Sequence, residues 1–248
     1  MTSATSAEAG TPVERVANAR ARIAAACDRA GRTPSSVIVI GVGKTHGPEA
    51  IQAVVDAGVE DIGENRVSEL TAKQGRVAGA RWHLVGRLQR NKARDVVGHQ
   101  VLVHSLDRRS LADALSRRAQ DADVVQRALV QVNVGEDPAK GGCEADEALD
   151  LVAYARELPH LSVEGLMTIP PLPGPSDDAN DAAQPHFAAL RQLRDEARGR
   201  WPEVVHLSMG MTADVEAAVS EGATMVRLGT ALFGPRGSGP WRPAGGNR

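Results

Sequence analysis

The stretch Val37-Ile38-Val39-Ile40-Gly41-Val42-Gly43-Lys44 predicts a buried β-strand that ends on a cation. Its β-branched residues favour the extended conformation, and Pro48 is typical of the first position of a helix. A lysine between a buried strand and a helix is poorly placed for simple solubility. It is well placed to meet a ligand at the C-terminal end of a strand in an α/β barrel.

The same strand-then-helix pattern recurs along the chain. Further strands are expected at residues 60–64, 82–86, 101–106, 128–134, 161–169, 204–209 and 225–228, with helical patterns between them. Alternation of this kind predicts a parallel sheet. Eight units in 248 residues favour closure as a (β/α)8 TIM barrel over an open doubly wound sheet. A helical pattern from Val13 to Gly31 adds one extra N-terminal helix.

The barrel is expected to be a single domain, because no change of composition divides it. Residues 1–11 are rich in Ser, Thr, Ala and Gly and predict a disordered N-terminal tail. Residues 12–234 form the barrel, and residues 235–248 predict a flexible Pro/Gly/Arg tail.

The composition excludes several classes of function. A net charge of -2 gives no general attraction to nucleic acid, and 2% aromatic residues leave few platforms for stacking bases. No apolar run reaches the length of a membrane span, and no signal peptide opens the chain. Cys27 and Cys143 lack the spacing of a metal or redox motif. We therefore expect a soluble cytoplasmic protein without a metal.

Two glycine-containing segments follow the last two strands, where barrels often hold phosphate. They are Ser208-Met209-Gly210-Met211 and Arg227-Leu228-Gly229-Thr230. Either alone reads as a simple turn, but together they favour an anion site, because backbone N–H groups and hydroxyls suit phosphate oxygens. In a closed barrel Lys44 neighbours the eighth strand. A phosphate site beside an amine suits pyridoxal 5'-phosphate, whose aldehyde forms a Schiff base with lysine; the alternative is a solvated surface lysine.

Ordered motifs along the chain carry a resemblance to a known family. They are Val42-Gly43-Lys44-Thr45, Gly63-Glu64-Asn65, Trp82-His83-Leu84-Val85-Gly86, Leu88-Gln89-Arg90-Asn91-Lys92, Gln131-Val132-Asn133-Val134, Lys140-Gly141-Gly142, Gly165-Leu166-Met167-Thr168-Ile169-Pro170 and the two phosphate segments. Over residues 13–234 the chain resembles the pyridoxal phosphate homeostasis proteins, which are single-domain relatives of the N-terminal barrel of alanine racemase.

The resemblance implies a phosphate site. Ser208, Gly229 and Thr230 would bind the phosphate of the cofactor, with Met209 and Gly210 beside it.

The resemblance also implies how the cofactor ring is held. Lys44 would form the internal aldimine, and Arg227 would face the pyridine nitrogen, which fits a protein that holds the cofactor more than it uses it. Asn65 and His83 would line the pocket near the ring. For His83, a satisfied core histidine is an equal alternative.

The chain departs from the family at Gly43, at His46, where a basic residue is common, and at Arg87 and Arg90. Gly43 stands where the family usually has Ser, which removes one possible hydroxyl near Lys44. Arg87 and Arg90 add charge to a surface that already carries Lys92. This surface is either a solvated basic face or a docking patch for a cofactor-dependent enzyme or an acidic partner.

Three functions compete. The first is a monomeric, non-catalytic regulator that holds pyridoxal 5'-phosphate and buffers it or delivers it to apo-enzymes. The alternative is an amino-acid racemase, which needs bases on both faces of its substrate. The racemase relatives take their second base, a tyrosine, from another domain. Here Tyr154 is the single tyrosine and is expected on an outer helix, leaving Cys143 or a histidine as substitutes. The third, an interaction protein without ligand, conflicts with an intact Lys44.

Overall fold

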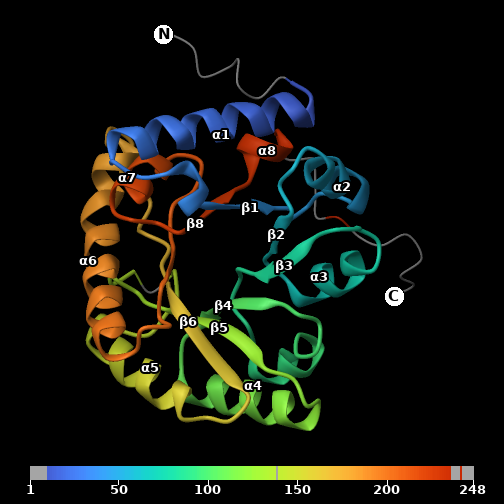
Figure 1. Cartoon of the computed structure of the whole chain (residues 1–248), viewed down its shortest axis with the longest axis vertical. Coiled ribbons are helices and arrows are strands. Elements are labelled where there is room, and N and C mark those ends of the chain that lie inside the picture. The colour runs from blue at the N-terminus through green and yellow to red at the C-terminus, as the bar shows by residue number, and fades with distance from the viewer. Residues whose placement is uncertain (1–9, 138, 236–240, 242–248) are drawn as a thin grey trace.

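Eight parallel strands close into a barrel in the order β1 to β8, which confirms the expected (β/α)8 architecture (Figure 1). The computed structural model describes residues 10–137, 139–235 and 241. The strands are β1 (Ile38–Val42), β2 (Asp61–Glu64), β3 (Arg81–Leu84), β4 (Leu102–Leu106), β5 (Gln126–Gln131), β6 (Leu161–Met167), β7 (His206–Ser208) and β8 (Met225–Leu228).

The helices lie outside the barrel (Figure 1). They are α1 (Pro12–Arg29), α2 (Pro48–Asp56), α3 (Val67–Gln74), α4 (Arg109–Asp121), α5 (Ala148–Arg156), α6 (Ala179–Arg200), α7 (Val215–Ser220) and α8 (Thr230–Phe233), with 3-10 turns η1 (Pro34–Ser36), η2 (Arg90–Asp95) and η3 (Ala145–Glu147). The α-helix expected after β3 is wrong: the segment forms η2. Its apolar residues Leu88, Ala93, Val96 and Val97 are all buried, so the segment packs against the core as a 3-10 turn with irregular flanks.

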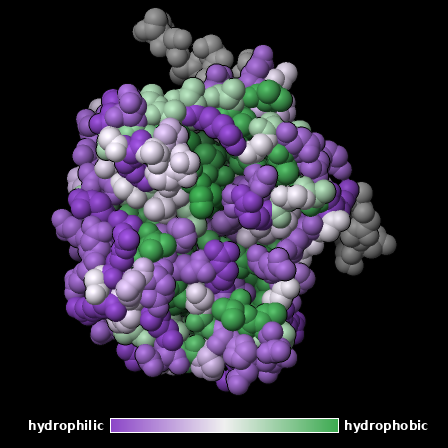
Figure 2. Space-filling view, in the orientation of Figure 1, coloured by the Kyte–Doolittle hydropathy of each residue, from purple (hydrophilic) through white to green (hydrophobic). Residues whose placement is uncertain are grey.

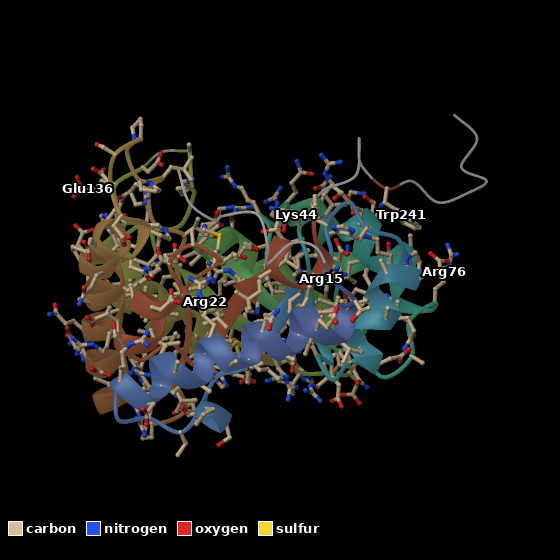
Figure 3. All side chains as sticks on the ribbon, turned by 90° about the horizontal axis from the view of Figure 1, so that it is seen from above. Arg15, Arg22, Lys44, Arg76, Glu136 and Trp241 are labelled. Atoms are coloured by element: carbon tan, nitrogen blue, oxygen red, sulfur yellow. The ribbon has the colours of Figure 1, made fainter. Side chains whose placement is uncertain are left out.

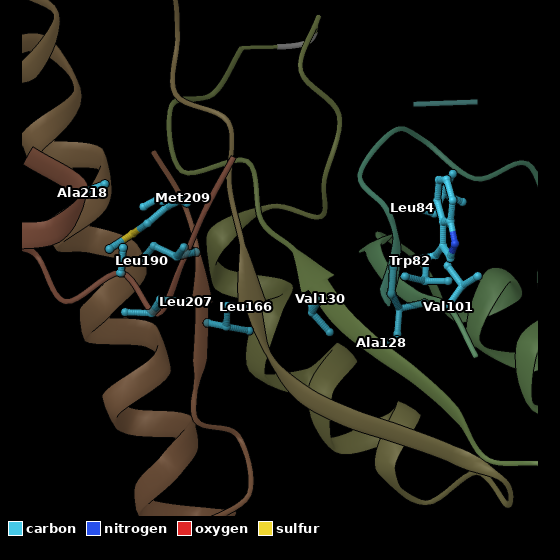
Figure 4. Close-up of a cluster of buried hydrophobic side chains, with 14 of the residues drawn as sticks. Trp82, Leu84, Val101, Ala128, Val130, Leu166, Leu190, Leu207, Met209 and Ala218 are labelled. Carbon is cyan, nitrogen blue, oxygen red and sulfur yellow. The ribbon is translucent and has the colours of Figure 1, made fainter. Parts of the chain in front are cut away.

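Two separate apolar layers follow from the alternation of side chains along each strand. Ile40, Leu102, Leu129, Met167 and Met225 fill the inside of the barrel. The larger layer lies between the strands and the helices, and Figure 4 shows part of it. The inner layer is small, which leaves room inside the barrel for polar side chains.

The first helix, α1, begins at a capping box. Thr11 caps α1: its hydroxyl accepts the N–H of Glu14, and the Glu14 carboxylate accepts the N–H of Thr11. Figure 1 shows α1 across α7 and α8, outside β1 and β8. The predicted N-terminal tail lies outside the described residues up to residue 9, as do residues 236–240 and 242–248 of the predicted C-terminal tail.

The surface carries both hydrophilic and apolar residues. Figure 2 shows hydrophilic residues over most of the visible face, with apolar residues at its centre and in scattered patches. Within the described residues, no helix is long and apolar enough to cross a membrane. The same part of the chain contains no cluster of His, Cys, Asp and Glu that could hold a metal ion.

Candidate functional site

Lys44 lies in a turn at the C-terminal end of β1. In Figure 3 Lys44, Glu136 and Trp241 lie along one edge of the molecule. Lys44 follows β1 and Glu136 follows β5, so this edge is where the strands end. Lys44 is half-buried, and the next residue, Thr45, has a left-handed backbone with φ of 72°. The sequence prediction that Lys44 sits at the mouth of the barrel therefore holds.

The chain beyond β8 presents free backbone donors beside the end of β1. The N–H groups of Gly229, Thr230 and Ala231 have no acceptor among the described residues. A Cβ built on Gly229 would meet nothing closer than the carbonyl oxygen of Val42, at 4.0 Å. Since Val42 lies two residues before Lys44, these open donors and the Lys44 turn are neighbours. Adjacent N–H groups of this kind suit the oxygens of an anion.

The turn after β7 requires glycine. Gly210 has φ of 91°, and a Cβ there would lie 2.4 Å from the Cβ of Ala218. Its carbonyl accepts the N–H of Arg227 at 2.9 Å, which joins the ends of β7 and β8. The N–H of Met211 donates to the Asp214 carboxylate, so this turn is held at both ends.

Arg227 is buried inside the barrel and cross-links three strands. Its guanidinium donates to the carbonyl and the hydroxyl of Ser208, at 2.7 and 2.8 Å, and to the carbonyl of Thr168 at 2.8 Å. Burial lowers the pKa of Arg227 to about 10, against the opposing effect of the Asp214 carboxylate. The guanidinium therefore keeps its charge at neutral pH and supplies a cation beneath the mouth.

A chain of buried hydrogen bonds runs from Ser208 toward the other end of the barrel. The Ser208 hydroxyl contacts Nδ1 of His104 at 2.9 Å, and Nε2 of His104 contacts Nδ1 of His83 at 2.9 Å. Nε2 of His83 contacts the Asp61 carboxylate at 3.0 Å. Arg81 donates twice to the same carboxylate, at 3.1 and 2.6 Å.

The direction of donation along this chain follows from its ends. Burial, and then the nearby charges of His83 and Arg227, lower the pKa of His104 well below its ordinary value, so this ring is neutral. At one end the Asp61 carboxylate can only accept, so Nε2 of His83 donates to it. At the other end the Ser208 oxygen accepts from the Arg227 guanidinium. Each polar group in the chain thereby has a partner.

The residues predicted to bind the cofactor differ in where the structure places them. Gly229, Thr230 and Gly210 lie at the mouth with Lys44, and Arg227 lies just beneath it. The hydroxyl of Ser208 is directed at His104, and both ring nitrogens of His83 have protein partners, as in the alternative of a satisfied core histidine.

Of the two other predicted residues, Met209 lies away from this group, whereas Asn65 follows β2 at the end where β2 pairs with β1. The side chain of Met209 is fully buried among Leu190, Leu207 and Ala218, in the layer between strands and helices (Figure 4). Asn65 is exposed just beyond the end of β2. Their roles as cofactor contacts remain predictions.

Asp61, Arg81 and His104, which complete the buried chain, were not predicted from the sequence. Asp61 and His104 are the main omissions. A signal was present: His104 interrupts the apolar run Val101-Leu102-Val103, and a polar residue in a buried strand requires a partner. Nothing in one sequence identifies that partner, because His104 and Ser208 lie 104 residues apart.

Gly43 was expected to remove a hydroxyl near Lys44, but the structure places this position next to α2 and Glu64. A Cβ at position 43 would lie 2.8 Å from Cδ1 of Ile51 in α2 and 3.1 Å from Oε1 of Glu64. A side chain there would point toward the helices and not toward the mouth. The missing hydroxyl is therefore a missing donor to Glu64.

The site fits a phosphate-bearing ligand with an electrophilic group. Three adjacent N–H donors without an acceptor, an open space in front of Gly229 and a buried guanidinium below suit the anion. Lys44 is the amine beside them.

Comparison with known proteins agrees with this geometry. Residues 15–237 match the family described as alanine racemase, N-terminal domain. A pyridoxal phosphate homeostasis protein of Aquifex aeolicus is 44% identical over 227 residues, covering 90% of this chain and 97% of the relative. The protein of the same name from Pseudomonas aeruginosa is 40% identical, covering 92% of this chain and 97% of the relative.

Solved structures give the same result. The structure of PipY from Synechococcus elongatus with PLP bound has a TM-score of 0.77 and 35% identity, and the match covers 90% of this chain and all (100%) of PipY. An alanine racemase of Clostridium difficile, at 13% identity, shares the fold with a TM-score of 0.68 over 87% of this chain and 59% of the racemase. The chain belongs to the pyridoxal phosphate homeostasis protein family, whose barrel is that of the N-terminal domain of alanine racemase.

Proposed function

We propose that this protein binds pyridoxal 5'-phosphate at the mouth of the barrel, as a reversible Schiff base on Lys44, and buffers the cofactor or delivers it to apo-enzymes. The observation that carries the proposal is the open set of N–H donors at residues 229–231, beside the Lys44 turn. The names of the relatives and the PLP bound to PipY support the choice of ligand.

Formation of the Schiff base on Lys44 needs no reactant other than the cofactor. The Nζ of Lys44 attacks the aldehyde carbon, a C=N bond forms, and one water leaves; hydrolysis reverses the step. Gly229, Thr230 and Ala231 would hold the phosphate, and Arg227 would place a cation near the ring nitrogen. A cation there keeps that nitrogen unprotonated, which weakens the ring as an electron sink.

Two of the candidates for the second base that a racemase needs, Tyr154 and Cys143, are poorly suited. Tyr154 lies on α5 and donates to Asp113 of α4 at 2.6 Å, on the outer layer of helices. Cys143 is buried, and this burial raises its pKa to about 12, so it stays a thiol. The relatives are named as homeostasis proteins, which suggests a regulatory role. We therefore favour a non-catalytic protein.

Further parts of the proposal concern setting and partners. We infer a monomer in the cytoplasm, which fits the two free and buried thiols of Cys27 and Cys143. PLP-dependent apo-enzymes are the inferred recipients of the cofactor.

Lysine mapping tests the proposal directly, because the chain contains four lysines: Lys44, Lys73, Lys92 and Lys140. The protein is mixed with pyridoxal phosphate, reduced with borohydride and digested, and the labelled peptide is identified by mass spectrometry. We expect label on Lys44, a yellow protein, and loss of both in Lys44→Ala. Lys92→Ala, which removes an exposed lysine, is the matched control. An unlabelled Lys44 would refute the proposal.

A second measurement separates the regulator from a racemase. The protein loaded with cofactor is incubated with L-alanine and other amino acids in deuterated water. We expect no exchange of the α-proton at enzyme-like turnover; exchange at that rate would establish catalysis instead.

A further inference from the structure

Three charged side chains form a buried cluster between the barrel and α3. Nζ of Lys73 lies 2.8 Å from Oε1 of Glu64, at the end of β2, and 3.0 Å from Oε2 of Glu69 in α3. Glu64 and Lys73 are fully buried, and Glu69 is 8% exposed. Oε2 of Glu64 is buried without a hydrogen-bond partner. Two carboxylates sharing one ammonium group is a costly arrangement for stability, because buried charges lose hydration.

The cluster holds the backbone on both sides of Lys44. Nζ of Lys73 donates to the carbonyl of Gly43 at 3.2 Å, and the N–H of Thr45 donates to Oε2 of Glu69 at 3.3 Å. The peptide groups that precede and follow Lys44 are therefore tied to one ion pair.

This anchoring matters because the turn is strained. Thr45 is β-branched and has φ of 72°, a conformation that such residues rarely adopt. Its hydroxyl is buried without a hydrogen-bond partner. Conformations of this kind persist only where surrounding contacts determine them, and they concentrate at functional sites. Glu69 and Lys73 supply those contacts.

Trp241 covers the cluster from the C-terminal part of the chain. Nζ of Lys73 lies 5.0 Å from the centroid of the Trp241 ring, and the Arg76 guanidinium carbon lies 6.0 Å from it. A Cβ built on Gly47 would lie 3.2 Å from Nε1 of Trp241, which places the indole beside the Lys44 turn. Figure 3 shows Trp241 on the same edge as Lys44.

We propose that Glu69 and Lys73 are positioning residues for Lys44, and that Trp241 keeps their ion pair out of water. The inference rests on the proposed function of Lys44. Orientation of a reacting group contributes strongly to rate, so a cluster that is expensive for stability serves to hold the amine toward the mouth.

The test measures how fast Lys44 reacts. Pyridoxal phosphate is added to the full-length protein, aliquots are reduced with borohydride at intervals, and label on the Lys44 peptide is quantified. In Glu69→Ala we expect labelling to slow by about 10- to 100-fold, since misplacing a reacting group by about 1 Å has effects of this size. Glu69→Gln keeps an oxygen that accepts the Thr45 N–H, and should restore most of the rate.

Two matched variants control for general damage. Glu164→Ala removes a carboxylate paired with Arg127 away from the mouth, and should leave the rate unchanged. Trp241→Ala should slow labelling about threefold or more, in keeping with loss of a cation–π contact. Trp201→Ala should not, although Trp201 makes a similar contact with Arg156. Melting temperatures recorded alongside separate unfolding from misplacement.

The outcomes are distinct. If wild-type Lys44 is never labelled, the proposed function fails. If wild type is labelled and a folded Glu69→Ala reacts as fast, the positioning role is refuted. Should Glu69→Ala fail to fold, Glu69→Asp decides: it keeps the charge but shortens the reach to Thr45, so slower labelling supports the inference and an unchanged rate refutes it.

Discussion

The two ends of β2 carry buried carboxylates whose pKa values move in opposite directions. Asp61 begins the strand and Glu64 ends it, only three residues later. Burial acts to raise the pKa of both. At Asp61 it is outweighed by hydrogen bonds from His83 and Arg81, which lower the pKa to about 2. At Glu64 burial prevails over Lys73, and the pKa rises to about 7.

The two carboxylates differ in the hydrogen-bond donors that contact them. Asp61 accepts from a guanidinium, which also pairs with Glu60, and from an imidazole, whereas Glu64 shares a single ammonium group with Glu69. The start of the strand is built for stability, because its charge is fully compensated. The end of the strand, below the Lys44 turn, holds more negative charge than its partners compensate. Incomplete compensation is typical of functional sites.

The largest effect is expected for Lys73→Met, which removes the only cation of the cluster. Two buried carboxylates would then face each other, and breaking a buried pair in this way costs about 3–5 kcal/mol. We expect this loss in urea unfolding at pH 8. At pH 5 the loss should be smaller, because Glu64 takes up a proton. An equal loss at both values would contradict the account of the cluster.

Glu64→Gln should stabilise the protein at high pH. Because the pKa of Glu64 is raised from 4.5 to about 7, its contribution is fully present below pH 4.5 and is lost as the pH rises through 7. At about 1.36 kcal/mol per pKa unit, the loss reaches about 3 kcal/mol. The amide cannot ionise, so the variant should match wild type at pH 4.5 and exceed it at pH 8. A variant less stable at pH 8 would show that the carboxylate charge is needed.

Asp61→Asn, the same chemical change at the other end of β2, should have the opposite sign. Because the pKa of Asp61 is lowered from 3.8 to about 2, its contribution is present above pH 3.8 and is lost as the pH falls through 2. We expect a loss of about 2 kcal/mol at neutral pH that disappears near pH 2. Acid unfolding monitored by circular dichroism checks this, and a neutral outcome at pH 7 would remove the contrast between the two ends.

The smallest effect is expected for Gly43→Ser. The new hydroxyl can donate to Glu64, while Cδ1 of Ile51 must move to admit the Cβ, so the net change in stability should stay within about 1 kcal/mol. The rate at which Lys44 is labelled should change less than in Glu69→Ala, because the side chain points away from the mouth. Gly210→Ser is the contrast: its φ of 91° and its contact with Ala218 predict clear destabilisation.

Much of the fold could be predicted because its signals are local. Alternating strand and helix patterns identified the eight units, and the position of Lys44 after β1 placed it at the mouth. The glycines after β7 and β8 identified the two strand ends proposed to hold phosphate through the same short-range logic. The α-helix expected in place of η2 was wrong because the spacing of buried apolar residues does not by itself distinguish an α-helix from a short 3-10 turn.

The sequence by itself determined the barrel, the lysine and the glycine-rich strand ends, since each depends on residues within a few positions of one another. Only the tertiary structure decided the partners of the buried polar groups. It joined Ser208 to His104, gave Glu64 and Glu69 one lysine to share, and brought Trp241 over that lysine. The physical reason is that a hydrogen bond or ion pair depends on distance in space, which closure of the barrel sets between residues far apart in the chain.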